Sequence, residues 1–284
     1  MTSTHDRQLV AVLGRGVVDR STPLLTADDL GITRGDGCFD ATRVVVDDAG
    51  RRVDHLERHL ARFARSWQLL DLGVPDLDAW RGLIGEAVAA WDVPGSATLK
   101  LLATRGVEHP AGQPTQLLTI TPHEPPGRPL DVVTLTRGYA SNAFSNAPWL
   151  LGGVKSLSYA VNVAATREAR RRGADDVLFT SADGFCLEGP TSALVTSLGG
   201  EMVLTPDGGT GILPSITAAV VCEGLRAAGV RVVERLLRPA DLYDADGAWL
   251  VSSIRGVCPI AHLDGRPLTR DRPRTREFER LAGY

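Results

Sequence analysis

The spacing of hydrophobic residues predicts two helices within the first 121 residues. Leu56, Leu60, Phe63, Trp67 and Leu70 recur every three or four positions, which is the period of a helix with one buried face. We therefore expect an amphipathic helix over residues 54–72, and similar spacing gives a second helix over residues 76–91. Short apolar runs bounded by turn residues predict strands. In this segment they lie at residues 9–13, 42–46, 52–53, 97–104 and 116–121.

A proline-rich stretch separates this segment from the rest. Four prolines fall within residues 122–129, and proline fits neither a helix interior nor a central strand. We therefore expect a linker at 122–129, between a small N-terminal α/β domain (residues 1–121) and a larger C-terminal domain (residues 130–284). In the second segment, strands are expected at 131–136, 177–180, 185–187, 193–196, 230–233, 249–252 and 257–261, and helices at 157–172, 215–228 and from 273.

The fold class that follows is α/β (α+β) with two lobes, an arrangement that favours a ligand cleft between them. Hydrophobic residues make up 43% of the chain and charged residues 23%, with a net charge of -3 and a pI of about 6.1. These values are ordinary for a soluble globular protein and give no support to nucleic-acid binding. No apolar run approaches the roughly 20 residues that span a bilayer. The N-terminal residues do not have the pattern of a signal peptide.

The cysteines support the same class. Cys38, Cys186, Cys222 and Cys258 are far apart, without a CxxC pair, so we expect neither a metal site nor a disulfide framework. Together these observations predict a cytoplasmic protein that acts on a small molecule and binds neither nucleic acid nor a membrane.

Only two of the 31 basic residues are lysines, Lys100 and Lys155. Unlike an arginine, a lysine can lose its proton and attack a carbonyl carbon. Lys100 lies in a strand-like run, where a single polar position is unremarkable. Lys155 follows Gly152, Gly153 and Val154, small residues that leave room around its amine. Lys155 is therefore the candidate for covalent chemistry, and the chance survival of a surface lysine is the alternative.

Three motifs in the first 160 residues add to this candidate. Residues 34–39 read Arg-Gly-Asp-Gly-Cys-Phe and continue as Asp-Ala-Thr-Arg-Val-Val. Residues 59–66 read His-Leu-Ala-Arg-Phe-Ala-Arg-Ser, where Arg62 offers two-point hydrogen bonding to a phosphate. A solvated helix face would give the same arginine spacing. The third motif is Lys155 with Tyr159 one helical turn later.

Two further motifs lie in the C-terminal segment. Residues 183–194 read Asp-Gly-Phe-Cys-Leu-Glu-Gly-Pro-Thr-Ser-Ala-Leu, with Glu188 isolated among apolar and small residues. Residues 211–217 read Gly-Ile-Leu-Pro-Ser-Ile-Thr at the start of a predicted helix, where unpaired N–H groups and the helix dipole favour a phosphate. A glutamate that caps a turn and a simple helix cap are the structural alternatives.

In this order, the five motifs resemble the fold-type IV (aminotransferase class IV) pyridoxal-phosphate enzymes. The resemblance implies a two-domain fold with pyridoxal 5'-phosphate in the interdomain cleft, Lys155 as the Schiff-base lysine, and a homodimer. Ala193 stands where the family has asparagine, and Ser215 where it has glycine. The cofactor contacts that the resemblance implies are Arg62, Ile216, Thr217 and Ser253 for the phosphate, Tyr159 for the 3-oxygen and Glu188 for the pyridine nitrogen.

Within this family, the chain looks most like aminodeoxychorismate lyase, which forms 4-aminobenzoate, a folate precursor, and pyruvate. Gly-Asp-Gly-Cys-Phe and the stretches at residues 155–162 and 188–191 carry this likeness. D-Amino-acid aminotransferases carry an Arg-x-His carboxylate trap after Thr-Arg-Gly, whereas residues 104–110 read Thr-Arg-Gly-Val-Glu-His-Pro, without the second arginine. Lys155 would then be the proton-transfer base.

The substrate of such a lyase is a dicarboxylate, so it needs cations. The candidates are Arg105, Arg255 and Arg43. Each of them could equally be a surface or strand-end charge. A D-amino-acid or branched-chain aminotransferase of the same family is the alternative function, and a non-catalytic binding protein that has lost the cofactor is a remote one.

Overall fold

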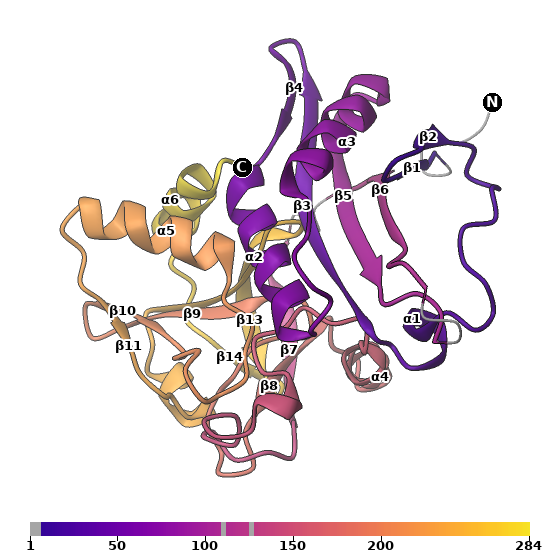
Figure 1. The fold of residues 1–284 in the computed structure, drawn as a ribbon. Coiled ribbons are helices and arrows are strands. Elements are labelled where there is room, and N and C mark those ends of the chain that lie inside the picture. Colours follow the sequence, from indigo (N-terminus) through magenta and orange to yellow (C-terminus); the bar gives the residue numbers. More distant parts are fainter. Residues whose placement is uncertain (1–6, 109–111, 125–127) are drawn as a thin grey trace. The chain divides into compact units, whose positions relative to one another are not determined.

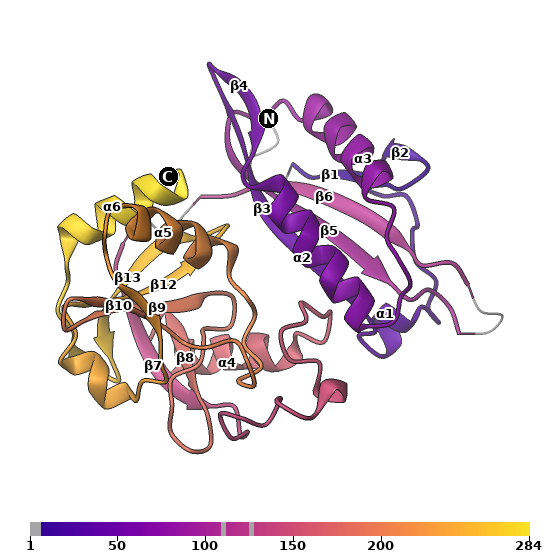
Figure 2. The same ribbon diagram turned by 60° about the vertical axis from the view of Figure 1, so that its left-hand side comes forward.

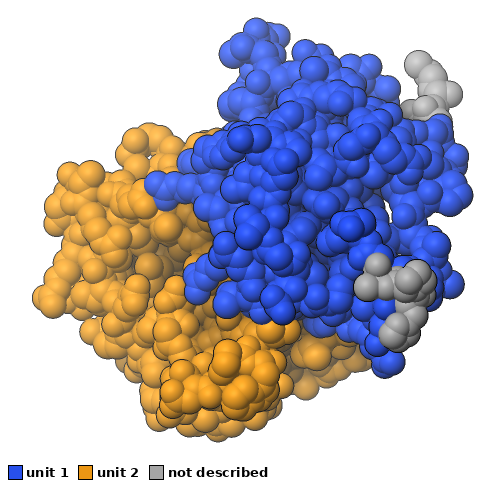
Figure 3. Space-filling view, viewed as in Figure 1, with its two compact units in different colours: residues 1–124, 154–159 blue, residues 125–153, 160–284 orange. Residues whose placement is uncertain are grey.

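A computed structural model describes residues 7–108, 112–124 and 128–284 of the chain (Figure 1). The chain divides into two compact units (Figure 3). The first comprises Met1–Glu124 and Val154–Tyr159, and the second comprises Pro125–Gly153 and Ala160–Tyr284. Residues 154–159 thus group with the first unit although they follow the linker in the sequence. Of the linker expected at 122–129, residues 125–127 lie outside the described residues.

The first unit is a six-stranded antiparallel sheet in the order β2-β1-β6-β5-β3-β4. Helices α2 and α3 lie on one face of it (Figure 2), where α2 contacts β3, and α3 contacts β1 and β2. The elements are β1 (Leu9–Val12), β2 (Gly16–Val18), α1 (Leu30–Thr33), β3 (Gly37–Asp47), β4 (Gly50–Val53), α2 (Leu56–Leu69), α3 (Leu77–Ala90), β5 (Gly95–Thr104) and β6 (Gln116–Pro122).

Side chains along β3 point alternately to the two faces of the sheet, and this determines which of them α2 covers. Asp40 and Val44 are fully buried on the α2 side, and successive side chains of a strand point to opposite faces, so Phe39 points away from α2. Between helices and sheet, the ring of Phe63 packs edge-on against Trp67 and Trp80, with centroids 5.6 and 5.2 Å away. This aromatic cluster joins α2 to α3.

The second unit is a mixed eight-stranded sheet in the order β11-β10-β9-β12-β13-β7-β8, with β14 paired to β13. The pairs β10–β11, β13–β7 and β7–β8 are parallel. The elements are β7 (Leu130–Thr136), α4 (Ala160–Arg171), β8 (Asp176–Thr180), β9 (Ala193–Leu198), β10 (Glu201–Leu204), α5 (Ile216–Ala227), β11 (Val232–Glu234), β12 (Gly247–Ser252), β13 (Gly256–Leu263), β14 (Arg266–Pro267), α6 (Arg272–Ala282) and the 3₁₀ turns Pro148–Leu150 and Pro239–Tyr243.

Both faces of this sheet are apolar. Along β12, Trp249 and Val251 belong to the cluster that includes residues of α5 and α6, while Leu250 belongs to a cluster on the other face. The ring centroid of Trp249 lies 4.7 Å from that of Phe278 in α6. This double burial explains why β12 is a continuous apolar run. No helix in the described part of the chain is long and apolar enough to cross a membrane.

The structure departs from the predicted elements in two informative places. The helix expected at 157–172 begins only at Ala160, because the residues before it pair with β3 of the first unit. The strand expected at 185–187 is reduced to a bridge between Thr180 and Cys186. The unpredicted elements β2, β10, β14 and α1 have at most four residues each, too few to show a hydrophobic period.

Gly37 lies where β3 approaches its neighbours most tightly. A Cβ atom there would lie 2.3 Å from the carbonyl oxygen of Ala103 and 2.7 Å from Cδ1 of Leu157. We predict that Gly37→Ala lowers the free energy of unfolding by about 1–3 kcal/mol, the usual cost of overpacking, as measured by urea unfolding. Gly82→Ala in α3 is the matched control, because no atom lies within 4 Å of its added Cβ. Equal stability of both variants would contradict this account.

Candidate active-site residues

The backbone of Lys155 is fixed as an added strand beside β3. The amide of Phe39 donates to the carbonyl of Lys155 at 2.9 Å, and the amide of Leu157 donates to the carbonyl of Gly37 at 2.9 Å. The amide of Lys155 also donates to Oγ of Ser66 in α2, at 3.1 Å. Lys155 is therefore tied to both a strand and a helix of the first unit.

The amine of Lys155 lies among aromatic rings. Its Nζ is 4.5 Å from the ring centroid of Phe39 and 5.7 Å from that of Tyr159. The two rings pack edge to face, with centroids 5.2 Å apart. Aromatic faces attract a cation, so the rings give the half-buried amine a defined position. Lys100 lies over the same Phe39 ring, with its Nζ 5.7 Å from the centroid.

Arg62 is anchored by a buried carboxylate that the sequence analysis did not single out. Nε and Nη2 of Arg62 donate to the two oxygens of Asp40, both at 2.8 Å. The ring Nδ1 of His59 lies 2.7 Å from Oδ1 of Asp40, and Asp40 is fully buried. His59 and Arg62 are three residues apart on α2, so both reach the same point on β3.

Asp40 and His59 each have a single protonation state near neutral pH. Burial by itself would raise the pKa of Asp40, but the charge and hydrogen bonds of Arg62 and the hydrogen bond of His59 outweigh it and hold that pKa well below its usual range. Burial lowers the pKa of His59, and the hydrogen bond to Asp40 offsets only part of the shift. Near neutral pH, Asp40 is therefore ionised and His59 is neutral, with its Nδ1–H donated to Asp40.

In the second unit, Glu188 stands at the end of a loop next to β9. Its Oε2 accepts the amide N–H of Leu213 at 3.1 Å, and its backbone forms a bridge with Ala193. The carboxylate is thereby tied to the segment that leads into α5. Ala193, which replaces the family's asparagine, contributes only a methyl group there.

The first turn of α5 has the features of an anion site. Ser215 caps the helix, because its Oγ accepts the amide N–H of Ala218. In the described part of the chain, the amides of Ile216 and Thr217 have no acceptor, as expected for the first helical turn. Thr217 Oγ1 and Ser253 Oγ lie 3.1 Å apart. Two amides, two hydroxyls and the positive end of the helix dipole suit a phosphate.

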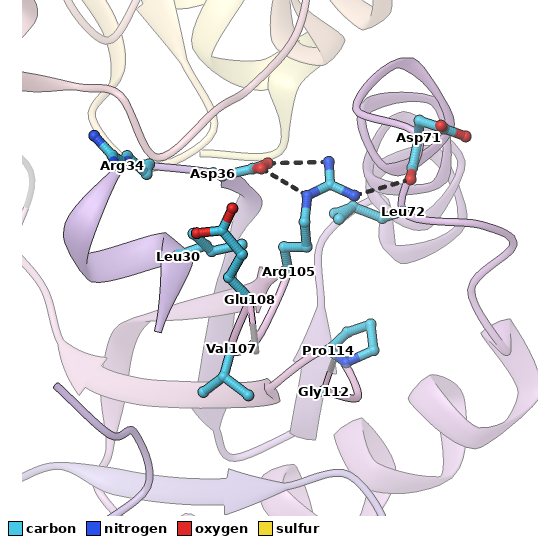
Figure 4. A pocket seen from close by; sticks show the side chains of 10 residues that line it. All are labelled: Leu30, Arg34, Asp36, Asp71, Leu72, Arg105, Val107, Glu108, Gly112 and Pro114. Atoms are coloured by element: carbon cyan, nitrogen blue, oxygen red, sulfur yellow. Dashed lines mark hydrogen bonds and ion pairs between the residues drawn. The ribbon is translucent and has the colours of Figure 1, made fainter. Parts of the chain in front are cut away.

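Arg105 lines a cavity of about 620 Å³ in the first unit (Figure 4). Its guanidinium points to Asp36, with Nε 2.6 Å from Oδ2. Its other nitrogens donate to the backbone carbonyls of Leu70 and Asp71, at 2.6 and 3.1 Å. Arg105 thus joins the Gly-Asp-Gly turn to the residues that follow α2, which gives it a structural role.

The other two candidate arginines also have carboxylate partners. Nε of Arg43 donates to Asp54 at 2.6 Å, and Nη1 of Arg255 donates to the buried Asp176. Whether any of the three arginines binds a substrate carboxylate stays a prediction. Residues 104–110 correspond to the stretch that carries the Arg-x-His carboxylate trap in D-amino-acid aminotransferases. Of these, His109 and Pro110 lie outside the described residues.

Comparison with known proteins decides the family. The sequence profile of the amino-transferase class IV family matches residues 37–263. The chain belongs to this family. A class IV relative in Mycobacterium tuberculosis, named bifunctional aminodeoxychorismate lyase / D-amino acid transaminase, is 38% identical over 277 residues, which are 92% of this chain and 93% of that protein.

Solved class IV structures have the same fold. The fold IV-transaminase CpuTA1 from Curtobacterium pusillum matches with a TM-score of 0.90 and 37% identity, over 98% of this chain and 100% of that one. The PLP-bound form of a hypothetical aminotransferase from M. tuberculosis matches with a TM-score of 0.90 and 36% identity, over 98% of both chains. The predicted family, fold class and cofactor are therefore confirmed. This class IV protein is a pyridoxal-phosphate enzyme, a lyase or a transaminase.

The residues described above fit that cofactor chemically. A phosphate dianion requires donors, and the first turn of α5 offers amides that have no acceptor in the described chain. A pyridine nitrogen requires an acidic partner, and Glu188 is a carboxylate held in place by a backbone amide. An aldehyde requires a primary amine, and the chain contains two lysines.

The neutral, buried His59 predicts a pH-dependent stability. Its pKa is lowered from 6.5, so the unfolded state binds a proton first as the pH falls, and folding loses free energy from about pH 6.5 downward. His59→Asn keeps a donor for Asp40 but does not titrate. The free energy of unfolding, measured from about pH 7 to about pH 5, should therefore fall less steeply in this variant. An unchanged slope in His59→Asn would refute the assignment.

Proposed function

We propose that the chain is a 4-amino-4-deoxychorismate lyase, which releases 4-aminobenzoate and pyruvate and so supplies a folate precursor. The observation that carries the proposal is the 38% identity, over nearly the full length, to a protein whose name includes this activity. The Gly-Asp-Gly-Cys-Phe motif and the missing second arginine after Thr-Arg-Gly support it.

Each candidate residue has its own contact with the cofactor in this proposal. Lys155 is the covalent anchor, and Tyr159 lies beside the cofactor's 3-oxygen. Glu188 keeps the pyridine nitrogen protonated, because a nearby anion favours the charged form. The phosphate is held by Arg62, Ile216, Thr217 and Ser253. Bound pyridoxal phosphate supplies an aldehyde that condenses with amines and a ring that accepts electrons from an adjacent C–H bond.

Lys155 then moves the proton. With the substrate bound, the amine of Lys155 would be the base that removes the proton from C4 of the substrate ring. The C–O bond to the enolpyruvyl group breaks, the oxygen leaves with the bonding electrons, and the ring becomes aromatic. The two products together contain all atoms of the substrate. An elimination of this kind therefore requires no keto-acid acceptor.

D-Amino-acid transamination is the second candidate, because the name of the M. tuberculosis relative includes it. Both reactions begin with proton removal by the same lysine and diverge afterwards. We also propose, from the family resemblance, that the enzyme is a cytoplasmic homodimer. The exposed side chains of Trp149 (73%) and Val161 (62%) are apolar surfaces that a second copy could cover.

Product analysis distinguishes the two reactions. Given 4-amino-4-deoxychorismate without a keto acid, the purified enzyme should release pyruvate and 4-aminobenzoate in equal amounts. Lys155→Arg should release neither, and borohydride should not attach cofactor to it, since an arginine cannot form an imine. If pyruvate is not formed while D-alanine is converted rapidly in the presence of an acceptor, the lyase proposal fails.

Lys100 is a further candidate for a substrate carboxylate. It lies opposite Ala41 on β3, one diagonal position from Phe39, and its amine lies over the ring that also contacts Lys155. We predict that Lys100→Met lowers kcat/KM for aminodeoxychorismate about ten-fold, the size of one lost charge-assisted hydrogen bond. The monocarboxylate D-alanine should be affected much less. Lys100→Arg keeps the charge and is the control, and equal losses for both substrates would remove Lys100 from this role.

A further inference from the structure

Asp40 is a fully buried charge with no part in the chemistry described so far. Its carboxylate accepts four hydrogen bonds: from the amide of Ala41 at 2.8 Å, from His59 Nδ1, and from Nε and Nη2 of Arg62. All four donors come from β3 and α2 of the first unit. The carboxylate of Asp40 thus links β3 to His59 and Arg62 of α2.

The pairing of Asp40 with Arg62 uses one edge of the guanidinium. Because Nε and Nη2 each bond to a different carboxylate oxygen, the planar group cannot rotate about its Cδ–Nε bond without breaking a hydrogen bond. The direction of the N–H bonds on Nη1 is fixed as a result. The Arg62 side chain is only 11% exposed, so packing restricts it further.

Stability alone does not explain this arrangement. A buried ion pair loses its hydration, and replacing it by apolar residues of similar volume is often neutral or stabilising. His59 adds a second cost, because its Nε2 is buried and has no hydrogen-bond partner in the described part of the chain. Electrostatics alone does not explain it either, since a carboxylate beside a phosphate-binding arginine weakens the attraction for the anion.

We infer that Asp40 is a positioning residue, which orients the guanidinium of Arg62 so that its other N–H groups donate to the phosphate of the cofactor. The inference rests on the proposed phosphate contact of Arg62. This role explains why the buried ion pair and the buried Nε2 of His59 are kept. The affinity for the phosphate that a preset guanidinium geometry gains offsets the repulsion from the charge of Asp40. His59 holds Asp40 in turn, through Oδ1, the same oxygen that accepts Nη2 of Arg62.

The test compares two cofactor forms, with and without the phosphate. The dissociation constants of pyridoxal 5'-phosphate and of pyridoxal are measured for the apoenzyme and for Asp40→Asn, which is isosteric but uncharged. Positioning predicts that the variant binds pyridoxal phosphate about ten-fold or more weakly, the size of one charge-assisted hydrogen bond, while its affinity for pyridoxal stays the same. A purely electrostatic effect has the opposite sign, because removal of the negative charge would tighten phosphate binding.

Two further variants control for structure. Asp29→Asn removes another buried carboxylate of the first unit, which bonds to Thr104 and the amide of Gly31, and should leave the ratio of the two affinities unchanged. If Asp40→Asn does not fold, as judged by its melting temperature, Asp40→Ser provides the same comparison. Tighter or unchanged binding of pyridoxal phosphate in a folded variant would overturn the inference, as would equal weakening of both ligands.

Arg62→Ala separates this inference from the proposal beneath it. The variant should lose affinity for pyridoxal phosphate but not for pyridoxal, and addition of Asp40→Asn should cause no further loss, since Asp40 acts only through Arg62. If Arg62→Ala affects both ligands equally, the phosphate role of Arg62 fails and the inference fails with it. If Arg62→Ala is selective and Asp40→Asn is not, only the role of Asp40 is overturned.

Discussion

Two backbone hydrogen bonds between β3 and residues 155–157 are the constraint on which the candidate site depends. They place Lys155 beside Phe39, and the next residue along the strand is Asp40, on the opposite face. Successive side chains of a strand point to opposite faces, so one short stretch of β3 contacts the amine of Lys155 on one face and Arg62, the proposed phosphate ligand, on the other. The absence of a side chain at Gly37 leaves the space that Leu157 and the carbonyl of Ala103 occupy. Main-chain pairing thus positions Lys155, and side-chain hydrogen bonds to Asp40 position Arg62.

The candidate residues of the second unit are positioned in a different way. Its sheet is covered by apolar clusters on both faces, and its candidate site residues lie at or beside the ends of strands and helices. Thr217 lies in the first turn of α5, Ser253 follows β12, and Glu188 precedes β9. Loop ends are adaptable, but here each is tied by a specific bond, such as that from Leu213 to Glu188. The proposed covalent anchor of the first unit is therefore fixed beside a strand, whereas the proposed cofactor contacts of the second unit lie at the ends of helices and strands.

The sequence predicted the long elements and the family because both depend on local patterns. The period of α2 and α3 and the five motifs are readable within windows of a few residues. Two kinds of feature were not predicted. Short elements such as β2 and β14 lack a period, and residues 154–159 were assigned to a helix start and to the later domain because their strand partner is more than 100 positions away. Asp40 did carry a signal, since it alternates with the buried Cys38 and Val44, and a charge at a core position usually has a purpose. Lys100 was noticed as one of only two lysines, but its position over the ring of Phe39 could not be predicted, because the register of the sheet sets which residues lie opposite each other.

The separate position of residues 154–159 in the sequence has a consequence for how the protein is made. The first unit is not finished when residue 124 leaves the ribosome, because residues 154–159, which pair with β3, are encoded after a stretch of the second unit. Until then, the edge of β3 at Gly37–Phe39 has unpaired backbone groups, a surface open to wrong pairing. Lys155, the proposed cofactor anchor, lies in the segment that closes this edge. Synthesis therefore completes the fold of the first unit and adds Lys155 to it in the same step.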